Sequence, residues 1–175
     1  SSVSPSKGAA DAWSDVDHTD RWHGDSLRGI MAGMTAGSNT AALGVVSTLA
    51  NALDADDFGR VEACLHPDVT YRINGATQRG PGEVVKSYRA GSALARSIFD
   101  HVEFGHKIVG FVGRDTIRVD FSDRLEANGE SFEHHSVQDV TVDPSGTILA
   151  IVDQPVTGQQ TRLDEFMNRH GLSRS

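Results

Sequence analysis

A single carboxylate stands on an otherwise apolar strand face in the second half of this sequence. From residue 117 onward, apolar residues alternate with polar ones in the period of two that a β-strand requires. Asp123 falls on the same face as Val119, Phe121 and Leu125, so alternation directs its side chain toward the core. A carboxylate there must be paired, hydrogen-bonded or raised in pKa, unless the strand has already reached the hydrated rim of the sheet.

A second polar set lies on the next predicted strand. His134 shares a face with Phe132, Ser136 and Gln138, and this mixture of apolar and hydrogen-bonding side chains is typical of a ligand-pocket wall. Together with His106, His134 also suggests metal binding. The sequence has no helical His-x-x-x-His and no compact carboxylate cluster, however, so we expect neither a metal nor another cofactor.

The elements that position these residues change type along the chain. Apolar residues recur at helical spacing in the early segments and at every second position in the later ones. Helices are predicted over about 40–54, 58–65, 82–95 and 159–170, and strands over about 69–73, 102–108, 117–125, 132–142 and 148–153. Helices followed by an antiparallel meander indicate an α+β fold, in which the helices cover one face of a curved sheet.

Composition narrows the class of protein. The 175 residues carry a net charge of −8, and their Lys and Arg residues are scattered singly, which argues against nucleic acid as a partner. Cys64 is the single cysteine, so no intrachain disulfide forms and a reducing compartment is expected. No apolar stretch approaches the ~18 residues of a membrane-spanning helix, and no signal-peptide pattern opens the sequence. We therefore expect a soluble cytoplasmic protein that does not bind membranes.

Residues 51–91 carry a resemblance to a known superfamily. The segment NALDADDFGRVEACLHPDVTYRINGATQRGPGEVVKSYRAG resembles the opening of nuclear transport factor 2-like proteins, with its aspartate pair, its Pro-Asp after the second helix and its Gly-containing turn. The resemblance covers about 40–155. It implies a cone-shaped, curved antiparallel sheet with three N-terminal helices enclosing a small-molecule pocket, and a homodimer formed through the sheet face. It does not select a function, because this fold hosts cyclases, isomerases, dehydratases, epoxide hydrolases and non-catalytic binders.

The chain is expected to divide into three parts. Ser, Gly, Ala and Asp dominate the beginning of the sequence, so residues 1–39 are predicted to be an extension that is flexible or docked on a neighbour. The nuclear transport factor 2-like domain is assigned to residues 40–157. Residues 158–175 then form a C-terminal helix and tail.

One branch of the superfamily suggests a catalytic pair. In proteins resembling scytalone dehydratase, an aspartate ends the first helix and a histidine begins the first long strand, and Asp54 and His101 fall at those places. A carboxylate beside an imidazole fixes its tautomer and stabilises imidazolium, so the histidine can remove a proton next to a leaving group. Strand alternation puts His106, not His101, with the inward apolar residues. His101 therefore needs a bulge or a strand start to face the pocket.

The steroid isomerase branch fits the sequence poorly. That chemistry uses a carboxylate base and an oxyanion site of tyrosine and protonated aspartic acid. The tyrosine position is occupied by Leu49, the base falls near Ile73 and the oxyanion acid falls at Gln138. All three groups are missing, and we reject steroid-type isomerisation.

The limonene epoxide hydrolase branch fits the sequence in part. Asp123 and Asp153 fall at the positions of its two aspartates, Tyr71 matches its tyrosine, and Asn74 lies near its asparagine. The position of the arginine that bridges the two aspartates holds Phe121 instead. Without that arginine the two carboxylates would repel each other, and one would be expected to stay protonated.

The sequence leads to one main hypothesis and two alternatives. The main hypothesis is a pocket enzyme of the lyase, dehydratase, isomerase or cyclase type, acting on a small apolar or polyketide-like molecule through His-Asp acid–base chemistry. Its catalytic residues would be Asp54 and His101. The pocket would be lined by Phe58, Tyr71, Phe104, Phe121, Asp123, His134, Gln138 and Asp153. The alternatives are an epoxide hydrolase that uses the aspartate pair and a non-catalytic ligand-binding or dimerisation module.

Overall fold

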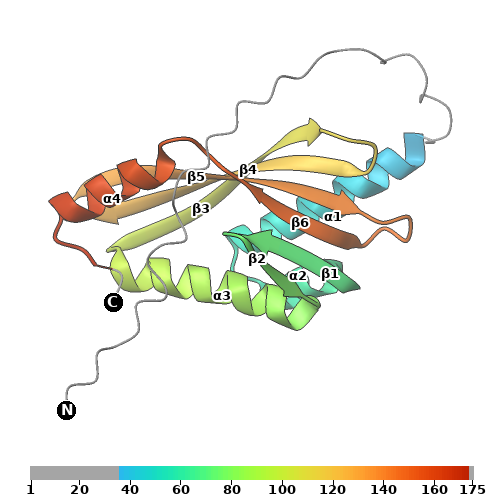
Figure 1. Ribbon diagram of the computed structural model, residues 1–175, viewed down its shortest axis with the longest axis horizontal. Helices are drawn as coiled ribbons and strands as arrows, with labels where there is room; N and C mark the ends of the chain where they lie inside the picture. The colour runs from blue at the N-terminus through green and yellow to red at the C-terminus, as the bar shows by residue number, and fades with distance from the viewer. Residues whose placement is uncertain (1–35, 174–175) are drawn as a thin grey trace.

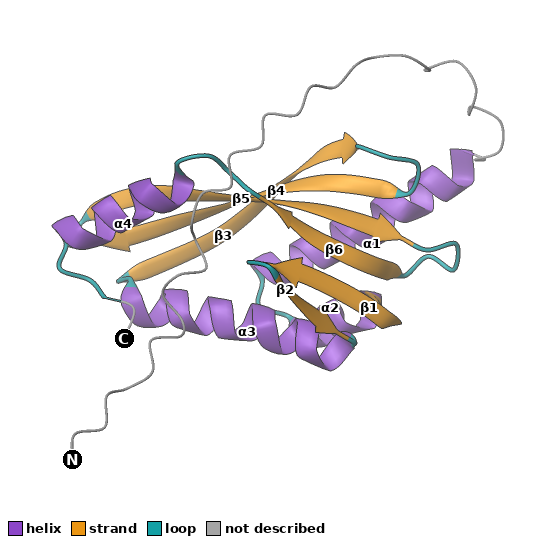
Figure 2. Cartoon of the chain, in the orientation of Figure 1, coloured by secondary structure: helices purple, strands orange, loops and turns teal. Residues whose placement is uncertain are grey.

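The computed structural model describes residues 36–173, so the extension predicted for the start of the chain lies largely outside the described residues. Four helices and six strands make up this part of the chain (Figures 1 and 2). In order they are α1 (Ala36–Asp54), α2 (Phe58–Cys64), β1 (Leu65–Ile73), β2 (Ala76–Arg79), α3 (Pro81–Ile98), β3 (His101–Phe111), β4 (Thr116–Ala127), β5 (Glu130–Val142), β6 (Ile148–Gln154) and α4 (Gln159–Arg169).

The strands form one curved sheet in the order β2-β1-β6-β5-β4-β3. Neighbouring strands are antiparallel except β1 and β6, which run parallel. Helix α1 contacts β3, α3 contacts β1 and β2, and α4 contacts β5. In Figure 1, α3 runs beneath the sheet while α4 lies at the opposite end from the start of α1. The predicted α+β fold is confirmed, with the refinement that the sheet is mixed, not wholly antiparallel.

Local signals explain where most elements begin and end. Asp57 caps α2, because its carboxylate accepts a hydrogen bond of 3.1 Å from the backbone N–H of Arg60. Pro81 occupies the first turn of α3, where its missing N–H costs no helical hydrogen bond. Pro67 prevents continuation of α2 and instead falls within β1.

The predicted Gly-rich turn after β1 contains a strand that sequence analysis missed. Strand β2 pairs with β1 across a tight turn in which Asn74 and Gly75 both have positive φ, at 52° and 74°. The strand is short and mostly exposed, so it lacks the alternation of apolar and polar residues that identifies a half-buried strand. The helix predicted to start near residue 40 likewise begins earlier, at Ala36.

The core has two parts on the helix-covered side of the sheet. The larger joins α1, α2 and α3 to the middle strands, and its fully buried residues include Val46, Leu49, Val61, Val84, Ile117, Val140 and Ile151. The smaller lies under α4, where Leu163, Phe166 and Met167 meet residues of β3, β4 and β5. The stretch of sheet between the two clusters is where a cavity remains open.

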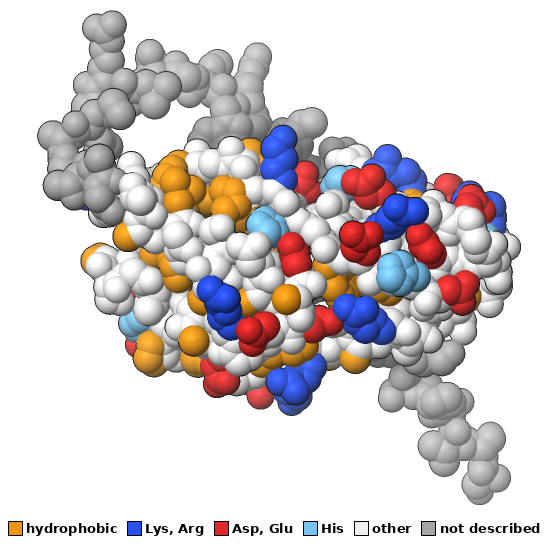
Figure 3. Space-filling view, turned by 180° about the vertical axis from the view of Figure 1, so that it is seen from behind, with side chains coloured by type: hydrophobic (Ala, Val, Ile, Leu, Met, Phe, Trp, Pro, Cys, Tyr) orange, Lys and Arg blue, Asp and Glu red, His pale blue; other side chains and the backbone are white. Residues whose placement is uncertain are grey.

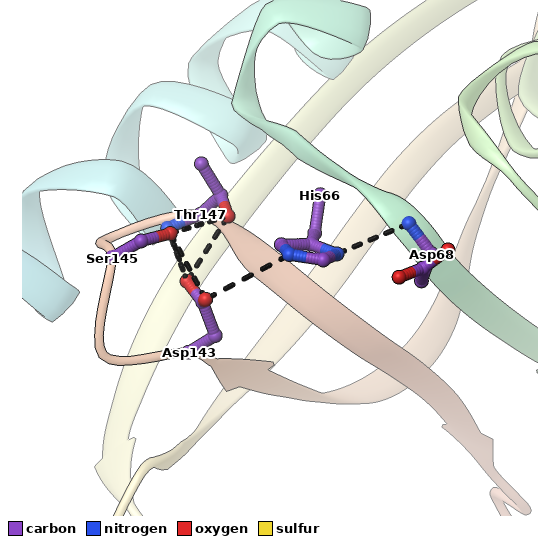
Figure 4. Close-up of polar contacts among 5 residues, drawn as sticks. All are labelled: His66, Asp68, Asp143, Ser145 and Thr147. Atoms are coloured by element: carbon purple, nitrogen blue, oxygen red, sulfur yellow. Dashed lines mark hydrogen bonds and ion pairs between the residues drawn. The ribbon is translucent and has the colours of Figure 1, made fainter.

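The turn between β5 and β6 is fixed by Asp143 (Figure 4). Its carboxylate accepts hydrogen bonds from the backbone N–H of Thr147 at 2.9 Å and from the hydroxyls of Ser145 and Thr147. These donors lower the pKa of Asp143 to about 2. His66 of β1 lies 3.9 Å from the same carboxylate, and its Nδ1 accepts a hydrogen bond from the backbone N–H of Asp68. The turn thus links β5, β6 and β1.

The surface of the protein is mixed in character. Figure 3, seen from behind, shows acidic and basic side chains interspersed over much of this face, with apolar side chains gathered toward one end. None of the helices in the described part of the chain combines the length and apolar character needed to cross a bilayer.

Two leucines of α1 are expected to differ strongly in how much they contribute to the free energy of unfolding. Leu49 is fully buried, whereas Leu43 on the same helix is 37% exposed. We expect Leu49→Ala to lower the free energy of unfolding by about 2–5 kcal/mol, because it removes buried methyl groups and leaves a cavity. Leu43→Ala should cost about 1 kcal/mol or less. Urea unfolding of both variants measures the difference, and equal losses would contradict this placement of α1.

Candidate functional site

A cavity of about 320 Å³ lies between the helices and the inner face of the sheet. Its wall is formed by the end of α1, the turn that follows, the start of α2, one face of α3, and strands β1, β3, β4, β5 and β6. All but one of the predicted site residues line it, namely Asp54, Phe58, Tyr71, Phe104, Phe121, Asp123, His134, Gln138 and Asp153. A concave and mainly apolar wall with a few polar groups is the usual form of a small-molecule site.

A hydrogen-bonded network in this wall ends at the carboxylate of Asp153. Gln138 donates from Nε2 to Asp153 Oδ1 at 2.8 Å and to the Tyr71 hydroxyl oxygen at 3.1 Å. Tyr71 donates its own proton to Asp153 Oδ1 at 3.2 Å. Tyr88 donates to Gln138 Oε1 at 2.9 Å. Each of these hydroxyl and amide groups therefore has a partner, and the hydrogen bonds all run toward the carboxylate.

Strand register and helix position build this network. Gln138 of β5 stands directly opposite Asp153 of β6. The parallel pairing of β1 with β6 puts Tyr71 opposite Ile151, two residues from the aspartate on the same face. Helix α3 then presents Tyr88, whose ring stacks on that of Tyr71 with centroids 5.0 Å apart and planes 13° from parallel. Four elements thus contribute to one network, and β1 and β5 supply the donors to the carboxylate on β6.

The environment of Asp153 changes its acidity. Burial raises the pKa of Asp153 to about 6, although the hydrogen bonds from Gln138 and Tyr71 act in the opposite direction. Burial also raises the pKa values of Tyr71 and Tyr88, so both phenols stay protonated and serve as donors. The second oxygen, Asp153 Oδ2, has only a contact of 3.4 Å to Tyr71 among the described residues. It has capacity to accept a proton or hydrogen bond from a ligand.

Asp123 and His134 form a second polar pair in the wall. They stand opposite each other on β4 and β5, and Asp123 Oδ2 lies 3.5 Å from His134 Nδ1. Each side chain is about a quarter exposed, at 26% for the aspartate and 25% for the histidine. Alternation therefore gave the correct face for both residues. The sequence allowed either a core position or the hydrated rim of the sheet for Asp123, and its partial exposure lies between these two environments.

The predicted pair of Asp54 and His101 requires a correction. His101 is exposed at the first position of β3, and the register with β4 is regular from His101 to Ile108, so the bulge that would turn it inward is absent. Asp54 instead meets His106, with Oδ2 and Nδ1 only 2.6 Å apart. Strand alternation had placed His106 on the inner face, whereas the family placement had favoured His101.

Among the described residues, no arginine lines the cavity in place of the one that the epoxide hydrolase resemblance requires. Arg118 is bonded to Asp139 at 2.8 Å on the other face of the sheet, and Arg124 contacts Glu126. Within the described residues, no hydrogen bond or ion pair joins Asp123 to Asp153. Asn74 is exposed in the β1–β2 turn and does not line the cavity.

Sequence analysis did not assign four of the polar lining residues to the site, namely Asp56, Ser87, Tyr88 and Ser92. Tyr88 was identified only as an apolar position of the third helix, although its hydroxyl reaches into the wall. Ser136 lines the cavity from the inner face of β5, the face on which alternation had placed it with His134 and Gln138. Asp56 lies in the turn after α1 with a φ of 52°, and no periodic pattern reports on such a position.

Arg96 lies outside the cavity wall near the end of α1 and contacts two of the lining residues. The Arg96 guanidinium donates to Asp56 Oδ2 at 2.7 Å and lies over the Phe104 ring at 5.0 Å. The other oxygen of Asp56 and the Oδ1 atom of Asp54 are buried without a hydrogen-bond partner among the described residues. This end of the cavity therefore holds two carboxylate oxygens with unused capacity to accept a hydrogen bond.

Comparisons with known proteins identify the fold. Solved structures with similar architecture include an LEH-like epoxide hydrolase from Mycobacterium tuberculosis, which is 21% identical over 71% of this chain and 90% of its own, with a TM-score of 0.54. An NTF2-like protein of unknown function from Burkholderia pseudomallei is 20% identical over 70% and 96%, also with a TM-score of 0.54. The chain has an NTF2-like fold.

Another solved structure with similar architecture contains a bound small molecule. Rv0760c from Mycobacterium tuberculosis, solved in complex with estradiol-17β-hemisuccinate, is 15% identical over 68% of this chain and 96% of its own, with a TM-score of 0.53. No protein-family model matches the chain, and no curated protein matches its sequence. At these identities the NTF2-like neighbours establish the fold alone. The described residues contain no group of three or more His, Cys, Asp or Glu side chains placed to hold a metal ion.

The raised pKa of Asp153 predicts how its removal affects stability. Its pKa is about 6 in the folded protein and 3.8 in the unfolded chain, so folding takes up a proton between these values and stability falls as the pH rises through this window. Asp153→Asn cannot ionise. We therefore expect the melting temperature of this variant, relative to wild type, to rise between about pH 4.5 and about pH 7.5.

Asp143→Asn provides the control. The pKa of Asp143 is lowered to about 2, so its stabilising charge is lost only as the pH falls below the unfolded value of 3.8. The difference between this variant and wild type should stay constant over the same range. A constant difference for Asp153→Asn as well would contradict the buried environment described for that carboxylate.

Proposed function

We propose that this protein is a cofactor-independent enzyme that transfers a proton at a small, largely apolar molecule, with Asp153 as the proton acceptor. The observation that carries the proposal is a carboxylate in the cavity wall with a pKa raised to about 6, held by Tyr71 and Gln138. A general base works best when its pKa lies near the operating pH. Carboxylates with shifted pKa values in a cavity are candidates for this role.

The arrangement around Asp153 suits proton removal. Its Oδ1 atom receives hydrogen bonds from neutral donors, which position the carboxyl group without neutralising its charge. Its Oδ2 atom has spare acceptor capacity, and partial burial in a mainly apolar wall limits the hydration of the charge. The proton would leave a carbon next to a carbonyl or a leaving group, as isomerases, lyases and cyclases require.

The other polar pairs have supporting roles in this proposal. His134, held beside Asp123, would return a proton to the substrate. The pair formed by Asp54 and His106 retains the His-Asp chemistry inferred from the sequence, with a different histidine. His106 is not among the residues that line the cavity, whereas Asp153 is, and for this reason we assign the proton transfer to Asp153.

Epoxide hydrolysis is the second candidate. Here Asp153 would activate a water molecule, and the hydrogen bond from Tyr71 matches the geometry that the family resemblance suggests. The lack of a cationic side chain beside Phe121 disfavours it, because the opening epoxide needs a proton donor or positive charge at its oxygen. A protein that binds small molecules without catalysis is the alternative to both enzymes.

The homodimer through the sheet face and the cytoplasmic location stay predictions.

Substitutions at the carboxylate test the proposal. We expect Asp153→Asn to lower turnover by about 10²–10⁴-fold, because it removes the proton acceptor but keeps the shape of the side chain. Tyr71→Phe should reduce turnover less, since it removes only one positioning hydrogen bond. Turnover of β,γ-unsaturated ketones is measured by the ultraviolet absorbance of the conjugated product. Loss of water from β-hydroxyketones and addition of water to styrene oxide are measured by mass spectrometry.

His101→Gln is the matched control, because His101 is exposed at the start of β3. It should leave turnover within about twofold of wild type. Loss of activity in His101→Gln with full activity in Asp153→Asn would reverse the assignment. Binding of these compounds with no turnover of any would favour the non-catalytic reading. Diol formation from styrene oxide alone would select the hydrolase.

A further inference from the structure

Asp123 and Asp153 face the same cavity from different levels of the sheet, where one level, or row, means the inward-facing residues paired across neighbouring strands. A row that contains an aromatic residue lies between them. Asp123 stands opposite His134, and Asp153 stands opposite Gln138, two rows further along β5. The intervening row pairs Phe121 with Ser136. The protein therefore holds two carboxylates on either side of an aromatic ring.

The cavity wall is short of positive charge. Four carboxylates line it, from Asp54, Asp56, Asp123 and Asp153, and in residues 36–173 no Lys or Arg side chain lines it with them. Arg96 compensates Asp56 from outside the wall, and His106 and His134 compensate their partners only when protonated. Asp153 has only uncharged donors. Charges removed from water need a partner, and here the protein does not supply enough of them.

The aromatic rings of the wall differ in their cation contacts. Arg89 lies over the Phe58 ring and Arg96 over the Phe104 ring, each at 5.0 Å from the centroid. Within the described part of the chain, no Lys or Arg lies over the ring of Phe121. Its neighbouring ring is that of His106, with the two centroids 6.3 Å apart. An aromatic face near carboxylates is a favourable place for an organic ammonium group.

We propose that the cavity binds a small apolar amine in its protonated form, with the ammonium group against the Phe121 ring and beside Asp123. The rest of the molecule would extend along the apolar wall toward Asp153. The ligand thus brings the positive charge that the protein lacks between the two carboxylates. The inference deepens the proposed function by naming the substrate class, and it rests on that function only in placing the ligand in the same cavity.

Three probes of almost equal size test the inference. Phenethylamine is cationic at neutral pH, 2-phenylethanol is uncharged and 3-phenylpropionate is anionic. We expect calorimetry to show phenethylamine binding about tenfold or more tighter than 2-phenylethanol, with the weakest binding by 3-phenylpropionate. Equal binding of the amine and the carboxylate, or no amine binding at millimolar concentration, would overturn the inference.

Two variants separate a local effect from the overall acidity of the protein. Asp123→Asn should remove the preference for the amine over the alcohol and leave alcohol binding unchanged. Asp120→Asn removes the same charge from the same strand, but Asp120 lies on the outer face, where it contacts His135 at 3.2 Å. It should keep the preference. An equal loss in both variants would show that the net charge of −8, not the site, attracts the amine.

Failure of this inference is distinguishable from failure of the proposed function. Proton transfer at Asp153 on uncharged substrates, with no preference for phenethylamine, would overturn the amine assignment alone. A preference for phenethylamine that depends on Asp123, in a protein without turnover, would support the amine assignment and overturn the enzyme.

Discussion

The burial of Asp153 is the constraint on which the site depends. A carboxylate in an apolar wall is costly unless it is hydrogen-bonded, and here two other elements supply its donors while a third holds one of those donors in place. Tyr71 belongs to β1, Gln138 to β5 and Tyr88 to α3. The parallel pairing of β1 with β6 brings the first of these into place, and the turn held by Asp143 supports that pairing. A shift of any one element would expose or isolate the carboxylate.

The same arrangement accounts for the unusual charge of the cavity. Because Asp153 is held by neutral donors, its negative charge is positioned without being cancelled. Asp123 lies one aromatic row away with a histidine as its partner. The wall can therefore accept a proton at one point and attract a cation at another. Both properties arise from carboxylates on the inner face of a sheet whose arginines point outward.

Sequence reasoning located the face of each strand residue better than it located partners. Alternation along β4 and β5 correctly directed Asp123, His134 and Gln138 inward, because a strand's side chains alternate strictly. The same rule favoured His106 over His101, and the error came from giving a family position more weight than strand parity. Tyr88 was missed because helical spacing predicts which face of a helix is buried, but not which group the hydroxyl of a long side chain contacts. The contact of Tyr71 with Asp153 joins segments far apart in sequence, and no local pattern encodes such a parallel pairing.

The acidity of Asp153 is the property that tests this account most directly. The carboxyl ¹³C chemical shift of Asp153, followed by NMR through a pH titration, reports the proton on that group alone, and Asp153→Asn identifies its signal. Burial among Tyr71, Gln138 and the apolar wall predicts a midpoint at about 6. A midpoint at the ordinary value of 3.8 would mean that the carboxylate is hydrated, and it would contradict the role of Asp153 as the base of the cavity.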